Sequence, residues 1–160
     1  MMRNDSTIPI KSNSISVYIC RRVENRMQIL LLDRDTGSED NWGITFAQVK
    51  PMEMCWQAAL NEVRTDTGAV PDRIYSVDHV ETFYDVKLHA VMLSPVFVAF
   101  FDHGQDTKPI LPNVKSMWLD ASESMVYLAL AHQRDIVKMI NKEFFAREPS
   151  EDLKVYPTRF

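Results

Sequence analysis

Three acidic side chains, Glu53, Glu62 and Asp66, have the types and spacing that best fit chemistry in this chain. Glu62 and Asp66 are four residues apart, so on a helix their carboxylates lie one turn from each other on one side. Glu53 comes just before the same helical segment. Carboxylate oxygens gathered where a loop enters a helix can hold a hard cation such as Mg2+. The sequence therefore predicts a metal site built from these three residues.

The element that must position these carboxylates is a helix predicted over residues 54–67. No helix-breaking residue interrupts this segment, and its apolar residues recur at steps of three and four, as on a buried helix face. These residues are Trp56, Ala59, Leu60 and Val63. Gly68 follows and is expected to end the helix.

The stretch from Ala47 to Ala69 resembles the box of the Nudix hydrolase family. That box reads Gly, five residues, Glu, seven residues, Arg-Glu-apolar, one residue, Glu-Glu, one residue, Gly-apolar. Anchoring it on Gly68 places Glu53 at the isolated Glu and Glu62 directly after the Arg position. Asp66 falls on the second residue of the Glu pair, one methylene shorter. The likeness to family members that act on nucleoside or pterin triphosphates extends over roughly residues 14–142.

Three positions of the box are replaced in this chain. Asn61 stands at the Arg, which normally braces the loop through a bidentate fork onto a carboxylate, and Asn61 has neither that charge nor that reach. Thr65 removes one carboxylate of the Glu pair. Ala47 stands at the first Gly, and if this position needs a positive φ, Ala costs on the order of 1 kcal/mol or reshapes the loop.

The resemblance implies cleavage of a nucleoside diphosphate linked to another group, with Mg2+ or Mn2+ binding the phosphates and activating water. It implies Glu62 and Asp66 as metal ligands, with Glu53 assisting the loop or a further ion. Triphosphate-acting relatives have an additional Glu shortly before the Trp of the last strand. Here Leu111-Pro112-Asn113 occupies that place, so a substitute would come from the preceding loop. The candidates are Asp102, His103 and Asp106.

Two functional hypotheses follow. The first is a divalent-metal-dependent pyrophosphohydrolase of a nucleoside or pterin triphosphate, with a weakened box that uses Glu62, Asp66 and Glu53. The alternative is a Nudix-fold protein that has lost catalysis and binds a nucleotide-like small molecule or a partner in the same cleft. A third interpretation is that the three carboxylates are only the solvated face of an amphipathic helix.

Composition restricts the class of protein. With 160 residues, of which 46% are hydrophobic, the chain is large enough for one domain with a substantial core. Its net charge of −4 argues against non-specific nucleic-acid binding, which needs a basic surface. Cys20 and Cys55 have no metal-site spacing and are expected to be reduced and packed. No signal peptide or membrane-spanning run is evident, so a cytoplasmic location is expected.

The order of predicted elements is strands, helix, strands, helix, which favours an α+β sandwich with a mixed β-sheet between two main helices. The Nudix resemblance implies the same α/β/α fold. The second long helix is expected to open with a capping box at Asp120 and Glu123. We expect a flexible tail over residues 1–13, the domain over 14–142, and a C-terminal tail over 143–160. Tyr156 and Phe160 in that tail are candidates for contacts in a homodimer.

Overall fold

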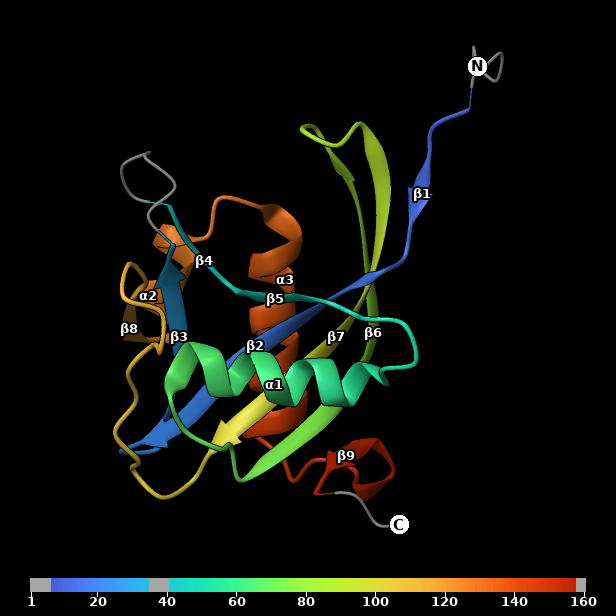
Figure 1. Cartoon of the computed structure of the whole chain (residues 1–160). Coiled ribbons are helices and arrows are strands. Elements are labelled where there is room, and N and C mark those ends of the chain that lie inside the picture. The colour runs from blue at the N-terminus through green and yellow to red at the C-terminus, as the bar shows by residue number, and fades with distance from the viewer. Residues whose placement is uncertain (1–6, 35–40, 158–160) are drawn as a thin grey trace.

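The computed structural model describes residues 7–34 and 41–157. A mixed β-sheet lies between helix α1 on one face and helix α3 on the other (Figure 1). Its strands are β1 (Ile10–Lys11), β2 (Ser14–Val23), β3 (Arg26–Asp33), β4 (Trp42–Gly43), β5 (Thr45–Gln48), β6 (Arg73–Asp85), β7 (Ala90–Phe101), β8 (Lys115–Asp120) and β9 (Lys154–Tyr156). The helices are α1 (Cys55–Thr67), α2 (Ala121–Tyr127) and α3 (Ala131–Ile140), with a π turn at Asn141–Phe145 and a 3-10 turn at Glu151–Leu153. The predicted fold class is confirmed.

The sheet is built around β2 and β7, which pair in parallel at its centre. The main path runs β4-β3-β2-β7-β6-β9, and β5, β8 and β1 pair with β2, β3 and β7 respectively. The β1–β7 pair is also parallel, whereas the other pairs of the described strands are antiparallel. The sheet is therefore mixed, as the sequence predicts.

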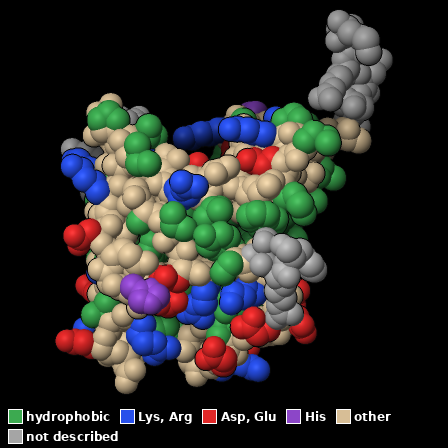
Figure 2. Space-filling model, turned by 60° about the horizontal axis from the view of Figure 1, so that its bottom comes forward, with side chains coloured by type: hydrophobic (Ala, Val, Ile, Leu, Met, Phe, Trp, Pro, Cys, Tyr) green, Lys and Arg blue, Asp and Glu red, His purple; other side chains and the backbone are tan. Residues whose placement is uncertain are grey.

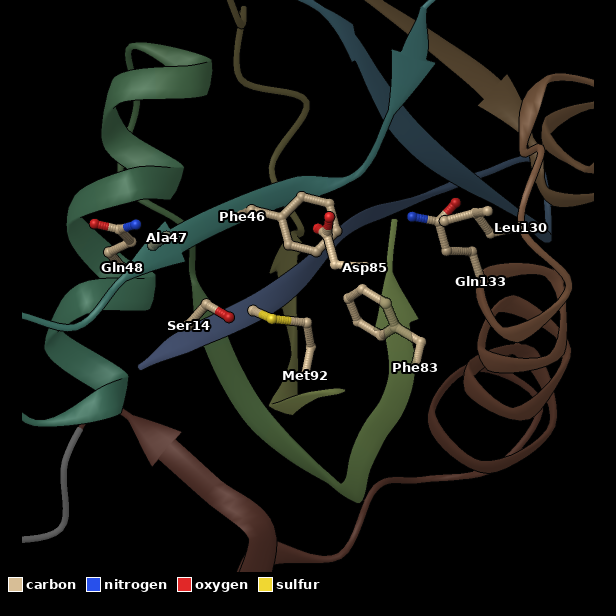
Figure 3. A pocket seen from close by; sticks show the side chains of 9 residues that line it. All are labelled: Ser14, Phe46, Ala47, Gln48, Phe83, Asp85, Met92, Leu130 and Gln133. Carbon is tan, nitrogen blue, oxygen red and sulfur yellow. The ribbon is translucent and has the colours of Figure 1, made fainter. Parts of the chain in front are cut away.

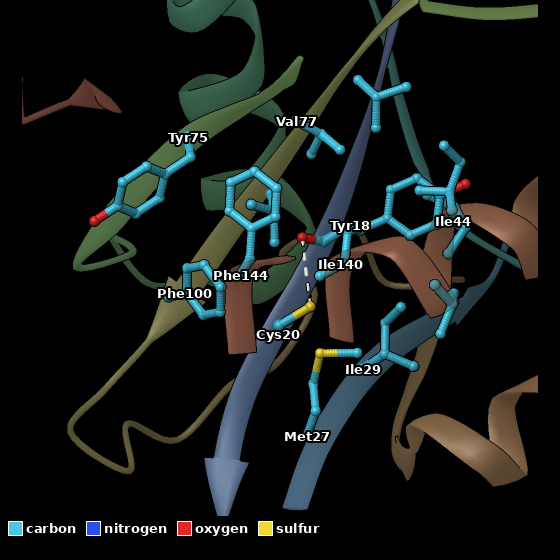
Figure 4. Packing of buried hydrophobic residues seen from close by; sticks show 14 of the residues in the cluster. Tyr18, Cys20, Met27, Ile29, Ile44, Tyr75, Val77, Phe100, Ile140 and Phe144 are labelled. Carbon is cyan, nitrogen blue, oxygen red and sulfur yellow. Dashed lines mark hydrogen bonds between the residues drawn. The ribbon is translucent and has the colours of Figure 1, made fainter. Parts of the chain in front are cut away.

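Alternation along each central strand divides the core into two layers. On β2, Val17 and Ile19 pack toward α1, whereas Tyr18 and Cys20 pack toward α3. Figure 4 shows the α3 layer, in which the Cys20 thiol lies 3.9 Å from the carbonyl oxygen of Tyr18. Burial raises the pKa of this thiol, so it stays protonated, as expected of a packed, reduced cysteine.

The single long helix predicted after β8 is wrong, because the structure has two shorter helices. The predicted capping box is present at the start of α2, where the Glu123 carboxylate accepts a hydrogen bond from the amide of Asp120. The chain then leaves the helical conformation at Leu128, which is buried with 1% of its surface exposed. The carbonyl of Leu128 accepts a hydrogen bond from Arg134 at 2.7 Å. Core packing and this bond stabilise a break that no Gly or Pro signals.

The folded domain extends beyond residue 142, where the sequence suggested a C-terminal tail. Phe144 is buried in the α3 layer, and β9 pairs with β6 through Tyr156 and Ile74. At the other end, β1 pairs with β7 within the segment expected to be an N-terminal tail. Residue 160 and residues 1–6 lie outside the described part of the chain.

His89 lies exposed in the turn between β6 and β7. Its backbone has a φ of 49°, and its Nδ1 atom is 3.0 Å from the hydroxyl of Tyr84. Of its apolar neighbours, Ala90 and Val91 belong to β7, whereas Leu88 is exposed in the same turn. The helices in the described part of the chain are too short or too polar to cross a membrane.

Candidate functional site

Helix α1 carries Glu62 and Asp66 one turn apart on one side, as their spacing predicts. At its start the Gln57 side chain accepts a hydrogen bond from the amide of Met54. At its end Gly68 adopts the left-handed conformation with a φ of 67°, and its amide donates to the carbonyl of Arg64 at 2.8 Å. Two backbone bonds then tie this end to the loop before β8, from Lys108 to Thr67 and from Ile110 to Thr65. The helix that carries the carboxylates is therefore fixed at both ends.

Asp66 is buried, with 1% of its side chain exposed, and both of its oxygens have partners. Arg34, the residue after β3, makes a bidentate pair with it, at 3.1 Å from Nη1 to Oδ1 and 2.6 Å from Nη2 to Oδ2. The hydroxyl of Thr45, on β5, donates a third hydrogen bond to Oδ2 at 2.8 Å. The carboxylate thus joins the end of β3, strand β5 and helix α1.

Glu62 lies on the same side of the helix, and its Oε1 atom is 3.8 Å from Nη2 of Arg34. Burial and the neighbouring Asp66 charge raise the pKa of Glu62, while the Arg34 guanidinium acts in the opposite direction. With 27% of its side chain exposed, Glu62 can still be reached from solvent. The helical spacing brings these two carboxylates to one guanidinium.

Glu53 points to a different set of partners. Its carboxylate accepts a hydrogen bond from the amide of Lys50 at 3.1 Å and lies 3.4 Å from the side-chain nitrogen of Asn61. It therefore fixes the turn before α1 to the helix. Asn61, at the Arg position of the box, still braces this loop, although with a single neutral donor.

The arrangement of these residues does not fit a divalent cation. Among the described residues, no three or more His, Cys, Asp or Glu side chains form a group that could hold one. Mg2+ requires near-octahedral oxygen ligands at about 2.0–2.1 Å. Both oxygens of Asp66 are already hydrogen-bonded, and the Arg34 guanidinium occupies the place between Asp66 and Glu62. The metal-ligand roles of Glu53, Glu62 and Asp66 stay a prediction.

The other replaced box positions are accommodated locally. Ala47 lies within β5 and is absent from the positive-φ residues of the described chain, so the conditional strain at that position does not arise. Met52 adopts a positive φ of 66° instead, in the turn before α1. The hydroxyl of Thr65 donates back to the carbonyl of Asn61 at 3.1 Å, which satisfies it within the helix.

Two of the three loop residues considered as substitutes for the missing Glu, Asp102 and His103, are engaged elsewhere. Asp102 pairs with Arg73 through two bonds of 2.8 and 2.9 Å. The Nδ1 atom of His103 lies 2.7 Å from Oδ1 of Asp72. Asp106 is exposed. Asp102 and His103 thus stabilise the connection after β7.

A pocket of about 390 Å³ opens beside β5, on the face of the sheet opposite α1. We call it the β5–β6 pocket; its lining is Ser14, Phe46, Ala47, Gln48, Phe83, Asp85, Met92, Leu130 and Gln133. Figure 3 shows the Phe46 and Phe83 rings on either side of this space, with the side chains of Asp85 and Gln133 near them. Alternation along β5 directs Thr45 to Asp66 and Phe46 to the pocket. One strand therefore contributes to both sites.

Buried Glu81 and partly buried His132 form a polar pair behind the pocket wall, and no motif in the sequence marks this pair. Glu81 on β6 is 1% exposed, and its Oε2 atom lies 2.8 Å from Nε2 of His132. The His132 ring stacks on Phe83 at 4.7 Å between centroids. Burial raises the pKa of Glu81 and lowers the pKa of His132, so both favour their neutral forms. In the sequence His132 lies at helical spacing from the apolar residues Leu128 and Ile136, so only its polarity marks it as different.

Replacing Glu81 by Gln is expected to raise stability at pH 7 by about 1 kcal/mol, because it removes the cost of ionising a buried carboxyl. A raised pKa means that Glu81 favours the fold below its ordinary value of 4.5 and that this stability is lost as pH rises through the native pKa. For His132 the lowered pKa acts oppositely, since stability is lost as pH falls below 6.5. When the free energy of unfolding of Glu81→Gln is measured in urea as a function of pH, the loss of stability with rising pH that Glu81 causes should therefore be absent. The loss below pH 6.5 that His132 causes should remain.

The matched control for this measurement is Glu143→Gln, because Glu143 forms an exposed pair with Arg147 at 3.4 Å. It should leave the pH profile unchanged. A Glu81→Gln variant that is less stable than the parent at pH 7 would show that Glu81 and His132 form a charged pair instead.

Comparisons with known proteins match the structure and not the sequence. No family model and no curated protein matches the chain. A C. elegans Ap4A hydrolase in a binary complex aligns with a TM-score of 0.68 at 16% identity, covering 81% of this chain and 94% of its own. The NUDIX domain of Shewanella oneidensis NrtR, complexed with ADP ribose, gives 0.67 at 12% identity, with 86% and 89% covered.

The E. coli dihydroneopterin triphosphate pyrophosphohydrolase aligns with a TM-score of 0.65 at 18% identity, covering 86% of this chain and 95% of that protein. At sequence identities of 12–18%, these three similarities establish a shared fold. The chain has the Nudix fold.

Proposed function

We propose that the chain is a Nudix-fold binding protein for a nucleotide-like small molecule, which it holds in the β5–β6 pocket. The observation that carries this proposal is the pocket itself, because about 390 Å³ is within the range of small-molecule sites. The faces of Phe46 and Phe83 suit a flat heterocycle such as a purine or a pterin. Gln133 and Ser14 supply polar groups of the kind that orient such a ring.

Binding without hydrolysis is favoured by the Arg34–Asp66 pair. The metal-dependent chemistry expected of the box needs open carboxylate oxygens, and those of Asp66 are engaged by Arg34 and Thr45. The names of two similar structures support the ligand class, since one is complexed with ADP ribose and another is a dihydroneopterin triphosphate pyrophosphohydrolase.

The second candidate function is a weak pyrophosphohydrolase of a nucleoside or pterin triphosphate that depends on Mg2+ or Mn2+. Glu62 favours it, because this carboxylate is partly exposed and its contact with Arg34 is long at 3.8 Å. In this function Glu62, Asp66 and Glu53 are the metal ligands, which requires Arg34 to leave Asp66. Ap4A hydrolase is among the similar structures, so Ap4A belongs in the substrate panel.

We expect binding of at least one panel member by calorimetry in EDTA, with no phosphate or pyrophosphate release when Mg2+ or Mn2+ is added. The panel is nucleoside triphosphates, ADP ribose, Ap4A and dihydroneopterin triphosphate. Phe46→Ala should weaken binding about tenfold, because one stacking face is lost. The matched control is Tyr127→Ala, which removes an exposed aromatic ring of α2 outside the pocket.

Two outcomes would replace this proposal. Metal-dependent release by the wild type that disappears in Glu62→Gln would establish the hydrolase, since Gln keeps the size of Glu62 and removes its charge. If no panel member binds in EDTA, or if Phe46→Ala binds as tightly as the wild type, the pocket is excluded as the site of a nucleotide-like ligand.

A further inference from the structure

The Arg34 guanidinium lies where the box carboxylates would otherwise repel each other. It bonds both oxygens of Asp66 and lies 3.8 Å from Glu62, so one cation serves two carboxylates of α1. Asp66 is 1% exposed, and a buried carboxylate without a cation is strongly destabilising. The fold therefore needs a positive charge at this position.

Among residues 7–34 and 41–157, Arg34 is the only cation that pairs with Asp66 or Glu62. Thr45 contributes a neutral hydroxyl to Asp66, and Lys108 meets the end of α1 through its backbone. Asn61, which stands at the Arg position of the box, is neutral and contacts Glu53. Arg34 comes from the end of β3, so the cation is supplied by a different element from the one that the box would use.

We propose that Arg34 is the resident cation of this site and takes the place of a divalent metal at the Glu62–Asp66 pair. The planar guanidinium of Arg34 matches the two oxygens of one carboxylate. A Mg2+ ion would instead need near-octahedral oxygen ligands. A second cation is disfavoured because both oxygens of Asp66 are hydrogen-bonded and a dication would be repelled by the guanidinium. The pair gains affinity for a divalent ion only when Arg34 is removed. This inference is independent of the ligand in the β5–β6 pocket.

The test compares the thermal unfolding of the full chain in EDTA and in Mn2+, with Mn2+ binding followed by electron paramagnetic resonance. Wild type should show no bound Mn2+ and the same Tm in both buffers. Arg34→Gln should lower the Tm by about 10 °C in EDTA, because it leaves Asp66 buried without a cation. Mn2+ at roughly a hundred times its Kd should then restore about 5–10 °C.

Three further variants separate charge, geometry and location. Arg34→Lys keeps the charge without the fork, so it should lower the Tm and still exclude Mn2+. Arg34→Gln/Asp66→Asn removes both partners and should lose the Mn2+ response. Arg64→Gln removes an exposed arginine of the same helix and should behave as wild type.

Binding of Mn2+ by the wild type with a rise in Tm would overturn the proposal. A folded Arg34→Gln variant without any Mn2+ response would also overturn it. An Arg34→Gln variant that is unfolded in EDTA and folds in Mn2+ supports it, whereas one that stays unfolded in both buffers contradicts it, because a metal could then not replace the guanidinium. Pocket binding of ADP ribose by the wild type, measured in EDTA, reports separately on the proposed function.

Discussion

Replacing Asp66 by Ala is expected to lower the free energy of unfolding by about 3 kcal/mol, measured by urea denaturation at pH 7. The loss is large because three groups depend on this carboxylate. The Arg34 guanidinium loses both bonds of its fork, and the buried hydroxyl of Thr45 loses its acceptor. The end of β3, strand β5 and helix α1 would then lose the hydrogen bonds that join them through Asp66.

The control is Glu62→Ala, four residues earlier on the same helix. Glu62 is 27% exposed and 3.8 Å from Arg34, so its removal should change the free energy of unfolding by no more than about 1 kcal/mol. The comparison separates a structural carboxylate from one that only completes the charge of the site. Equal losses in the two variants would contradict the central place given to the Arg34–Asp66 pair.

Local patterns in the sequence were sufficient for the elements that bury one face. The apolar steps of three and four predict α1, and Gly68 predicts its end, because both signals lie within the helix itself. The alternation on β2 likewise predicts a strand, and the structure places its two sets of side chains in two core layers. These features depend on neighbours in the sequence and need no knowledge of tertiary contacts.

The chemistry of the site depends on a contact that no local pattern contains. Arg34 lies in a polar stretch of the sequence that is rich in turn residues, 32 residues before Asp66. Its role appears only when β3 and α1 are placed side by side. The resemblance to the box identifies Glu53, Glu62 and Asp66, but their spacing on a helix does not predict which cation lies next to them. The Glu81–His132 pair was missed for the same reason, since it joins β6 to α3.

The interruption of the second helix also follows from tertiary structure. Between α2 and α3 the sequence contains neither Gly nor Pro, so propensity alone favours continuation. In the folded chain the break buries Leu128 and places His132 against Glu81 at the start of α3. A continuous helix would carry these two side chains in directions set by its own 3.6-residue period. Packing and the buried polar pair override the local preference.

Three glycines allow the end of α1 to be tested as two separate effects, backbone conformation and space. Gly68 has a φ of 67°, and a Cβ there would lie 2.7 Å from the backbone oxygen of Lys108. Gly104 has a similar φ of 62° with open space around it. Gly43 has open space as well and needs no positive φ. The three sites thus differ by one factor at a time.

Gly104→Ala is expected to lower the free energy of unfolding by about 1–2 kcal/mol, the cost of a left-handed conformation with a side chain. Gly68→Ala should lower the free energy of unfolding by about 1–3 kcal/mol more than Gly104→Ala does. The added Cβ would clash with the Lys108 carbonyl, whose backbone is hydrogen-bonded to Thr67 and cannot move freely. Gly43→Ala should stay within about 0.5 kcal/mol of the parent. Urea denaturation measures all three.

Equal losses for Gly68→Ala and Gly104→Ala would mean that the loop before β8 yields at little cost. The bonds from Lys108 and Ile110 to the last turn of α1 would then not fix the helix. A larger loss at Gly68 would instead show that this loop holds the turn of α1 that contains Asp66. The same position that ends the box motif would then be required for the geometry of the Arg34–Asp66 pair, whether or not the chain ever binds a metal.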